Sequence, residues 1–167
     1  SCISHQYSQN QQTYAVLHGS YIWHGFEKES EITSFEGLSD ITESLYDVSV
    51  HTDTLLSEEA KVSLYTELKK CEITELNVDN ITQAEFDAIC EIETLEYLWM
   101  DQENTGLDLT NLSKLSNLRA LYLYGNRNIK ALPEDAFANM TQLYCLYIYD
   151  TSISSFPNIS DMETLES

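Results

Sequence analysis

The stretch LRALYLYGNRNIKALPEDAFANMTQL (Leu118–Leu143) holds one full period of a repeating pattern of apolar residues. Within it, Leu118, Leu121 and Leu123 open a short apolar segment, and Leu143 opens the next one. The opening position recurs along the chain at Ile73, Leu95, Leu118, Leu143 and Leu165. The steps are 22, 23, 25 and 22 residues, which lies within the range of about 20–29 residues of one class of solenoid repeat.

Each opening segment predicts a short strand, because its apolar residues alternate with outward-pointing positions. The predicted inward residues are Ile73, Leu76 and Val78; Leu95, Leu98 and Met100; Leu118, Leu121 and Leu123; and Leu143, Leu146 and Ile148. The return segments between strands carry further apolar residues that we expect to face the same core, among them Phe86, Ile89, Leu112, Phe137, Ile153, Phe156 and Ile159. The pattern therefore predicts an α/β fold with a parallel sheet.

The unit Leu118–Leu143 resembles the extracellular leucine-rich repeats, whose pattern is L-x-x-L-x-L-x-x-N-x-L-x-x-L-P-x-x-x-F-x-x-L. LPEDAF and the following Met140 fit this pattern closely, with one extra residue after Asn126. The segment LTNLSKLSNL is similar to the short repeats of bacterial internalin-like surface proteins. The resemblance covers about residues 32–167. It implies a leucine-rich repeat solenoid with a parallel concave β-sheet and short helices or irregular segments on the convex side. It also implies a binding role rather than catalysis.

Two regions are predicted: an N-terminal tether and capping segment over 1–44, and leucine-rich repeats over 45–167. Ser57–Cys71 predicts a helix, since it has a capping Ser, acidic residues in its first turn and lysines in its last. Upstream, Leu45, Val48 and Val50 predict another strand.

The N-terminal region also contains a weaker copy of the repeat. ITSFEGLSDITESL (Ile32–Leu45) closely resembles ISSFPNISDMETL (Ile153–Leu165). Tyr14–Trp23 predicts a hairpin or an atypical first strand, and residues 1–12, rich in Ser and Gln, predict a flexible tether. We expect this region to cap the exposed end of the repeat core.

The charge of the chain is strongly negative. It contains 28 acidic and 8 basic residues, for a net charge of −20. Such a surface repels phosphate, which argues against nucleic acid and anionic lipid headgroups as partners. Basic proteins, neutral sugars and divalent ions remain as partners, and acidity that serves only solubility is the alternative.

Location is predicted from the N-terminal dipeptide and from the cysteines. Ser1-Cys2 resembles the last two positions of a bacterial lipoprotein signal, which makes Cys2 a candidate lipid attachment site; a chance Cys near a trimmed end is the alternative. Animal extracellular members of the family carry cysteine-rich caps, and this chain has no such cluster. We therefore expect a bacterial extracytoplasmic protein, a cell-surface lipoprotein or a secreted one, with membrane contact only through the anchor.

The residue pattern favours neither an enzyme nor a cofactor-binding protein. Cys145 and His51 both face outward, but they are four strands apart, roughly 19 Å at the usual spacing, whereas a nucleophile and its base lie near 3 Å. The other histidines lack metal-ligand spacing, and no phosphate-binding glycine loop is present. Two alternatives stay open: a Cys71–Cys90 disulfide, and calcium near Asp47, Glu75 and Asp79.

The register places the remaining strand residues on the concave face, where one end is acidic and the other aromatic. We predict a non-enzymatic protein that recognises a protein ligand through this face; aromatic rings recur in binding hot spots, and acids attract basic partners. The predicted ligand-binding residues are Tyr97, Trp99, Asp101, Tyr122, Tyr124, Tyr147, Tyr149 and Asp150. The alternatives are a carbohydrate-binding surface protein and a structural, self-assembling module that uses an open C-terminal edge at Leu165–Ser167. Rings that only pack against each other along the sheet are the non-functional alternative.

Overall fold

A computed structural model describes residues 7–9, 12–16, 22–23, 34–41, 47–50, 56–102, 106–125, 127–157 and 159; up to residue 23 and at Ile41 only the backbone is described. Predictions that concern Cys2, His51, Asn126 and 160–167 lie outside the described residues.

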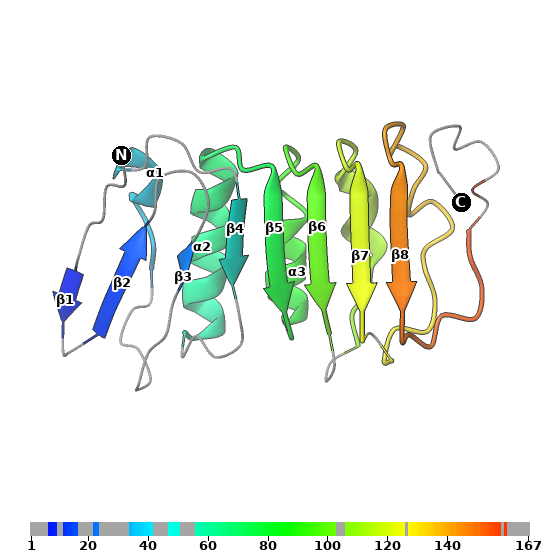
Figure 1. Cartoon of the computed structure of the whole chain (residues 1–167), viewed down its shortest axis with the longest axis horizontal. Coiled ribbons are helices and arrows are strands. Elements are labelled where there is room, and N and C mark those ends of the chain that lie inside the picture. The colour runs from blue at the N-terminus through cyan, green and yellow to red at the C-terminus, as the bar shows by residue number, and fades with distance from the viewer. Residues whose placement is uncertain are drawn as a thin grey trace.

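The described chain forms an α/β fold around one five-stranded parallel sheet, as the sequence predicts (Figure 1). Its strands follow the order of the chain: β4 (Asp47–Val50), β5 (Glu75–Asp79), β6 (Tyr97–Asp101), β7 (Ala120–Tyr124) and β8 (Cys145–Tyr149). Neighbouring strands pair in the register that the repeat period predicts, so that Leu76, Leu98, Leu121 and Leu146 stand opposite one another.

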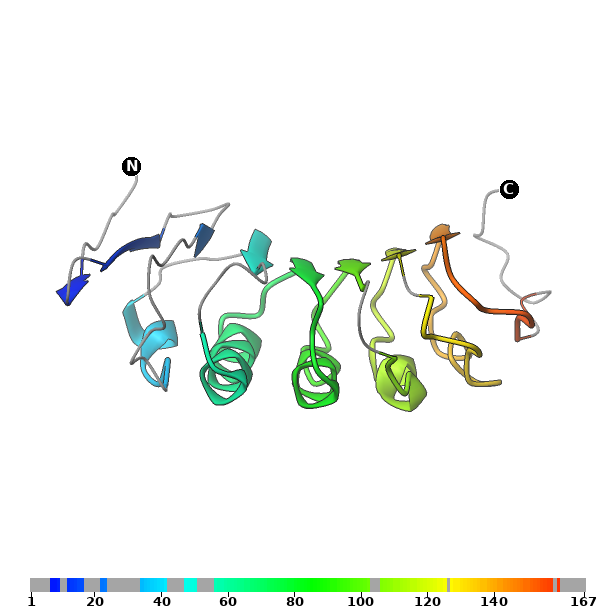
Figure 2. The same cartoon turned by 90° about the horizontal axis from the view of Figure 1, so that it is seen from below.

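The helices form one layer on one side of the strands, with α1 beside α2 at the N-terminal end (Figure 2). They are α1 (Leu38–Ile41), α2 (Glu58–Lys70), α3 (Gln83–Ile89) and the 3₁₀-helix η1 (Thr110–Lys114). The predicted helix over Ser57–Cys71 is confirmed: Ser57 caps α2 by accepting a hydrogen bond from the Ala60 N–H at 3.2 Å, and Cys71 ends it. The opposite face of the sheet carries no helix in Figure 2, and we call it the open face.

The core lies between the sheet and the helices. The inward residues of β4 to β7 are buried, and those of β8, Leu146 and Ile148, are partly buried. The return segments add large side chains such as Tyr65, Phe86 and Phe137. Each fully buried aliphatic or aromatic side chain contributes about 1.5–3 kcal/mol, so this layer carries most of the stability. Neighbouring turns are also tied by side chains: the Thr94 hydroxyl donates to the Ile73 carbonyl, and the Asn117 amide to that of Glu93, both at 2.7 Å.

The N-terminal region forms a second, antiparallel sheet of β1 (Tyr7–Gln9), β2 (Gln12–Val16) and β3 (Ile22–Trp23). The hairpin predicted for Tyr14–Trp23 is confirmed, since β2 and β3 pair. The tether predicted for 1–12 is wrong at Tyr7–Gln9, which pair with β2, and at Gln12, which begins β2. Strand pairing uses backbone groups that every residue in these strands carries, so a Ser- and Gln-rich composition does not exclude it.

Phe156 departs from its predicted inward position. Its side chain is 53% exposed, whereas Phe86 and Phe137, which occupy other return segments, are buried. Residues 151–157 form the last described return segment, and no later described segment covers it.

Candidate ligand-binding site

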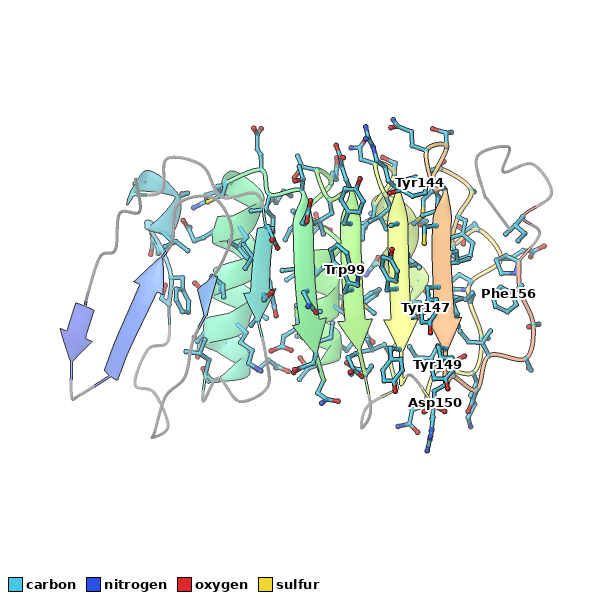
Figure 3. The ribbon with its side chains drawn as sticks, viewed as in Figure 1. Trp99, Tyr144, Tyr147, Tyr149, Asp150 and Phe156 are labelled. Atoms are coloured by element: carbon cyan, nitrogen blue, oxygen red, sulfur yellow. The ribbon has the colours of Figure 1, made fainter. Side chains whose placement is uncertain are left out.

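The open face is built from alternate residues of the five strands. Because side chains alternate between the two faces along a strand, the residues between the buried ones point toward the open face. The register then aligns Asn77, Trp99, Tyr122 and Tyr147 in one row across the sheet. A second row contains Asp79, Asp101, Tyr124 and Tyr149. Figure 3 shows the face with Trp99, Tyr147 and Tyr149 labelled along its strands.

Six aromatic side chains of this face contact one another, and we call them the aromatic ladder: Tyr97, Trp99, Tyr122, Tyr124, Tyr147 and Tyr149. The ring centroids of Trp99 and Tyr122 are 5.3 Å apart with an interplanar angle of 9°, and those of Tyr124 and Tyr149 are 5.5 Å apart at 11°. Two rings lying side by side in a single plane would overlap at these centroid distances. The near-parallel rings of each pair are therefore stacked face to face with an offset. Tyr147 extends the first row, with its centroid 6.1 Å from that of Tyr122. The ladder that the sequence predicts therefore forms.

Exposure within the ladder rises toward β8. Trp99 and Tyr122 are partly buried, whereas Tyr124 is 44%, Tyr147 47% and Tyr149 54% exposed. Stacked rings cover part of each other, so the solvent-facing aromatic area concentrates on β7 and β8. This end of the face is the part that a ligand can desolvate most.

Sequence reasoning missed one aromatic residue beside the ladder, Tyr144, which is 42% exposed. It precedes β8 at a position that strict alternation assigns to the core. Its hydroxyl is hydrogen bonded to Tyr97, and this bond, followed by burial, raises the pKa of Tyr144. An aromatic residue at a strand end, where alternation breaks down, is the only sequence signal that points to it.

A thiol also belongs to the ladder. The Cys145 sulfur and the Tyr122 hydroxyl oxygen are hydrogen bonded at 3.5 Å. This hydrogen bond, with a smaller effect of burial, raises the pKa of Tyr122 to about 12. The hydroxyl therefore stays neutral at physiological pH and offers a ligand a polar contact without charge.

The β4–β5 end of the open face is acidic. Asp47 stands opposite Glu75 in the register. Burial raises the pKa of both carboxyl groups, and for Glu75 the charges of Asp47 and Glu96 raise it further. None of the outward strand residues is Lys or Arg. A cation brought by a ligand would relieve this repulsion.

Six described cations form ion pairs away from the outward strand positions. On the helix side, Lys61 pairs with Glu85, Lys70 with Glu67, and Lys69 and Lys114 with Glu91. Arg119, just before β7, pairs with Glu96, and Arg127, after β7, pairs with Asp150.

Asp150, a predicted ligand-binding residue, is paired with Arg127. The Arg127 guanidinium binds both of its carboxylate oxygens, with Nε–Oδ1 and Nη2–Oδ2 distances of 2.9 and 2.6 Å. This contact lowers the pKa of Asp150 and compensates its charge. Asp150 also lies just past β8, with a backbone φ of 54°. Asp101 remains on the open face, between Asp79 and Tyr124.

The described residues include no group of three or more potential metal ligands, so the calcium alternative gains no support. Cys71 and Cys90 do not form a disulfide with each other. In the described part of the chain, no helix is long and apolar enough to span a bilayer. Comparison of the chain with known protein families, with curated proteins and with solved structures finds no match.

Proposed function

We propose that this chain is a leucine-rich repeat solenoid whose open face is a concave surface that binds a protein ligand without catalysis. The aromatic ladder is the observation that carries the proposal. Rings from three adjacent strands form one surface, and Tyr and Trp provide large contact areas at small cost in side-chain entropy. A ligand that covers Tyr124, Tyr147 and Tyr149 removes exposed aromatic area from water.

Charge supports a basic ligand. The acidic β4–β5 end lies beside the ladder, and the outward strand positions carry no basic residue. Complementary charge raises association rates and selects partners. The ligand is therefore a protein segment that joins basic residues to apolar or aromatic ones.

The geometry favours a protein over a carbohydrate. Sugar rings stack on free aromatic faces, whereas Trp99 and Tyr122 cover part of each other's faces at 5.3 Å. The salt dependence of binding distinguishes the two kinds of ligand. Binding of a basic protein weakens as ionic strength rises, because salt screens exposed charges, while binding of a neutral glycan barely changes.

The proposal includes an extracytoplasmic location, either secreted or held at the surface through lipid on Cys2. Mass spectrometry of the N-terminal peptide, from protein made in its own host, tests the anchor: a mass increase at Cys2 supports it, and an unmodified Cys2 leaves secretion.

The test of the site is a pull-down from a cell-surface extract with the natural chain and with a variant that carries Trp99→Ala, Tyr122→Ala and Tyr147→Ala. A control variant carries Glu59→Ala, Lys130→Ala and Asn139→Ala at exposed positions outside the five strands. Thermal melts verify that both variants are folded. We expect the ladder variant to lose the partner and the control to keep it. A partner retained by the folded ladder variant would refute the site.

A further inference from the structure

One nine-residue motif occurs twice in this chain. ITSFEGLSD (Ile32–Asp40) and ISSFPNISD (Ile153–Asp161) share five of nine residues without a gap. We call them the N-terminal and the C-terminal motif. In this alignment Ser34 corresponds to Ser155, and Phe35 to Phe156.

The N-terminal motif packs against α2. The Phe35 N–H donates to the Ser63 hydroxyl at 2.9 Å, and the Ser34 and Ser63 hydroxyl oxygens are 3.3 Å apart. One helical turn later, the Ser39 N–H and hydroxyl both donate to the Glu67 carboxylate, at 3.1 and 2.8 Å. The Phe35 side chain packs against the hydrophobic core. The side of α2 that carries Ser63 and Glu67 is therefore a receptor for this motif.

In the C-terminal motif, Ile153 and Ile159 pack against the protein's own core. No described segment covers Phe156, however, which is 53% exposed, whereas Phe35 is partly buried. Figure 3 shows Phe156 on the segment beyond β8, at the far end from α2. Residues 151–157 include no charged side chain that would resist burial against another protein. The chain thus holds two copies of the motif and one described receptor.

We propose that the C-terminal motif binds α2 of a second molecule of this protein, in place of that molecule's own N-terminal motif. Phe156 then occupies the position of Phe35, its N–H donates to the Ser63 hydroxyl of the second molecule, and Ser155 lies beside the same hydroxyl. The exchange joins unlike surfaces of the two molecules, so it links them head to tail, into a ring where the rotation between neighbours closes and into an open chain where it does not. It leaves the open face of each molecule unused.

The N-terminal motif of each molecule competes with the C-terminal motif of another molecule for the same α2. The N-terminal motif is tethered to its own α2, with an effective concentration on the order of 1 mM. Exchange between molecules therefore becomes visible only as the chain concentration approaches that range. Weakening the N-terminal motif lowers the threshold, and weakening the C-terminal motif removes the exchange.

Sedimentation of the full chain from about 0.01 to about 1 mM tests the exchange with a matched pair of variants. We expect the natural chain to gain mass at the upper end, Phe35→Ala to gain it at a concentration at least ~10-fold lower, and Phe156→Ala to stay monomeric. The double variant is also expected to stay monomeric. A natural chain and a Phe35→Ala variant that both remain monomeric would overturn the proposal, as would growth that survives Phe156→Ala.

Disulfide trapping tests the contact between the C-terminal motif and α2 directly, without depending on the strength of self-association. A chain with Ser155→Cys is mixed with a chain with Ser63→Cys under mild oxidation, and the linked peptides are identified by mass spectrometry. Ser34→Cys with Ser63→Cys in one chain is the positive control, because those hydroxyl oxygens are 3.3 Å apart. Ser154→Cys replaces Ser155→Cys in the matched negative control. We expect the 155–63 link between molecules to exceed the 154–63 link; equal yields would contradict the proposed contact.

Discussion

The side-chain amide of Gln102 forms two hydrogen bonds with the backbone of Ile81 in the preceding turn. Its Oε1 accepts from the Ile81 N–H at 2.9 Å, and its Nε2 donates to the Ile81 carbonyl at 2.7 Å. Both residues are buried. The Gln102 side chain, just after β6, thus provides a partner for both backbone groups of Ile81.

Replacing Gln102 by Leu should therefore destabilise the fold. Both backbone groups of Ile81 lose this partner in a buried site, and an unsatisfied buried group costs about 1–3 kcal/mol. We expect a loss of about 3 kcal/mol in urea unfolding. Gln142→Leu, at an exposed position, is the control and should change stability by less than about 0.5 kcal/mol. Similar effects of the two substitutions would show that the paired hydrogen bonds are not needed.

We expect the ionisation of Glu67 to make the protein less stable in acid. Hydrogen bonds from Lys70 and Ser39 lower the pKa of this buried carboxyl from 4.5 to about 2. Because the folded pKa is the lower one, the stabilisation is complete above pH 4.5 and disappears as the pH falls through about 2. Glu67→Gln should cost about 2 kcal/mol at pH 7 and almost nothing at pH 2. Unfolding curves of both proteins across this range test the prediction. A difference that does not depend on pH would rule out ionisation as the cause.

We expect the contribution of Glu75 to stability to depend on pH in the opposite direction. Burial and the charges of Asp47 and Glu96 raise its pKa. A carboxyl whose folded pKa is raised destabilises the fold at neutral pH, and this penalty disappears below its ordinary value of 4.5. Glu75→Gln should therefore stabilise the protein by about 0.5 kcal/mol at pH 7 and leave it unchanged near pH 3. Melting temperatures at both pH values provide the measurement, with Glu72→Gln, an exposed residue outside the sheet, as control.

Arg127 limits the negative charge beside the aromatic ladder. Its guanidinium holds Asp150 at 2.6 Å, so Arg127→Gln should leave an uncompensated carboxylate next to Tyr149. We expect a short oligolysine peptide to bind about twofold more tightly at low ionic strength, and the gain to vanish near 1 M salt. Calorimetric titration provides the affinities. Adding Asp150→Asn to this variant should cancel the gain; a gain that persists would assign it to another cause.

Much of the fold follows from the sequence, because a strand and a helix each bury one face with a fixed period. The steps between Ile73, Leu95, Leu118 and Leu143 predict both the strands and their register, since shifting a strand by one residue would move its leucines to the outside. The same alternation predicts the six rings of the aromatic ladder. It fails at Tyr144, which lies at a strand end. The apolar pattern of the return segments fails at Phe156, which is 53% exposed although Phe86 and Phe137 are buried.

The sequence by itself determined which residues form strands and which side chains share the open face, because both depend on spacing along the chain. Only the tertiary structure decided which groups meet across turns. Arg127 and Asp150 are 23 residues apart and Ser39 and Glu67 are 28 apart, and no local pattern encodes such contacts. They arise because stacked turns bring distant side chains within hydrogen-bond distance. Those contacts compensate Asp150, lower the pKa of Glu67 and hold the N-terminal motif on α2, while the similar motif at Phe156 stays exposed.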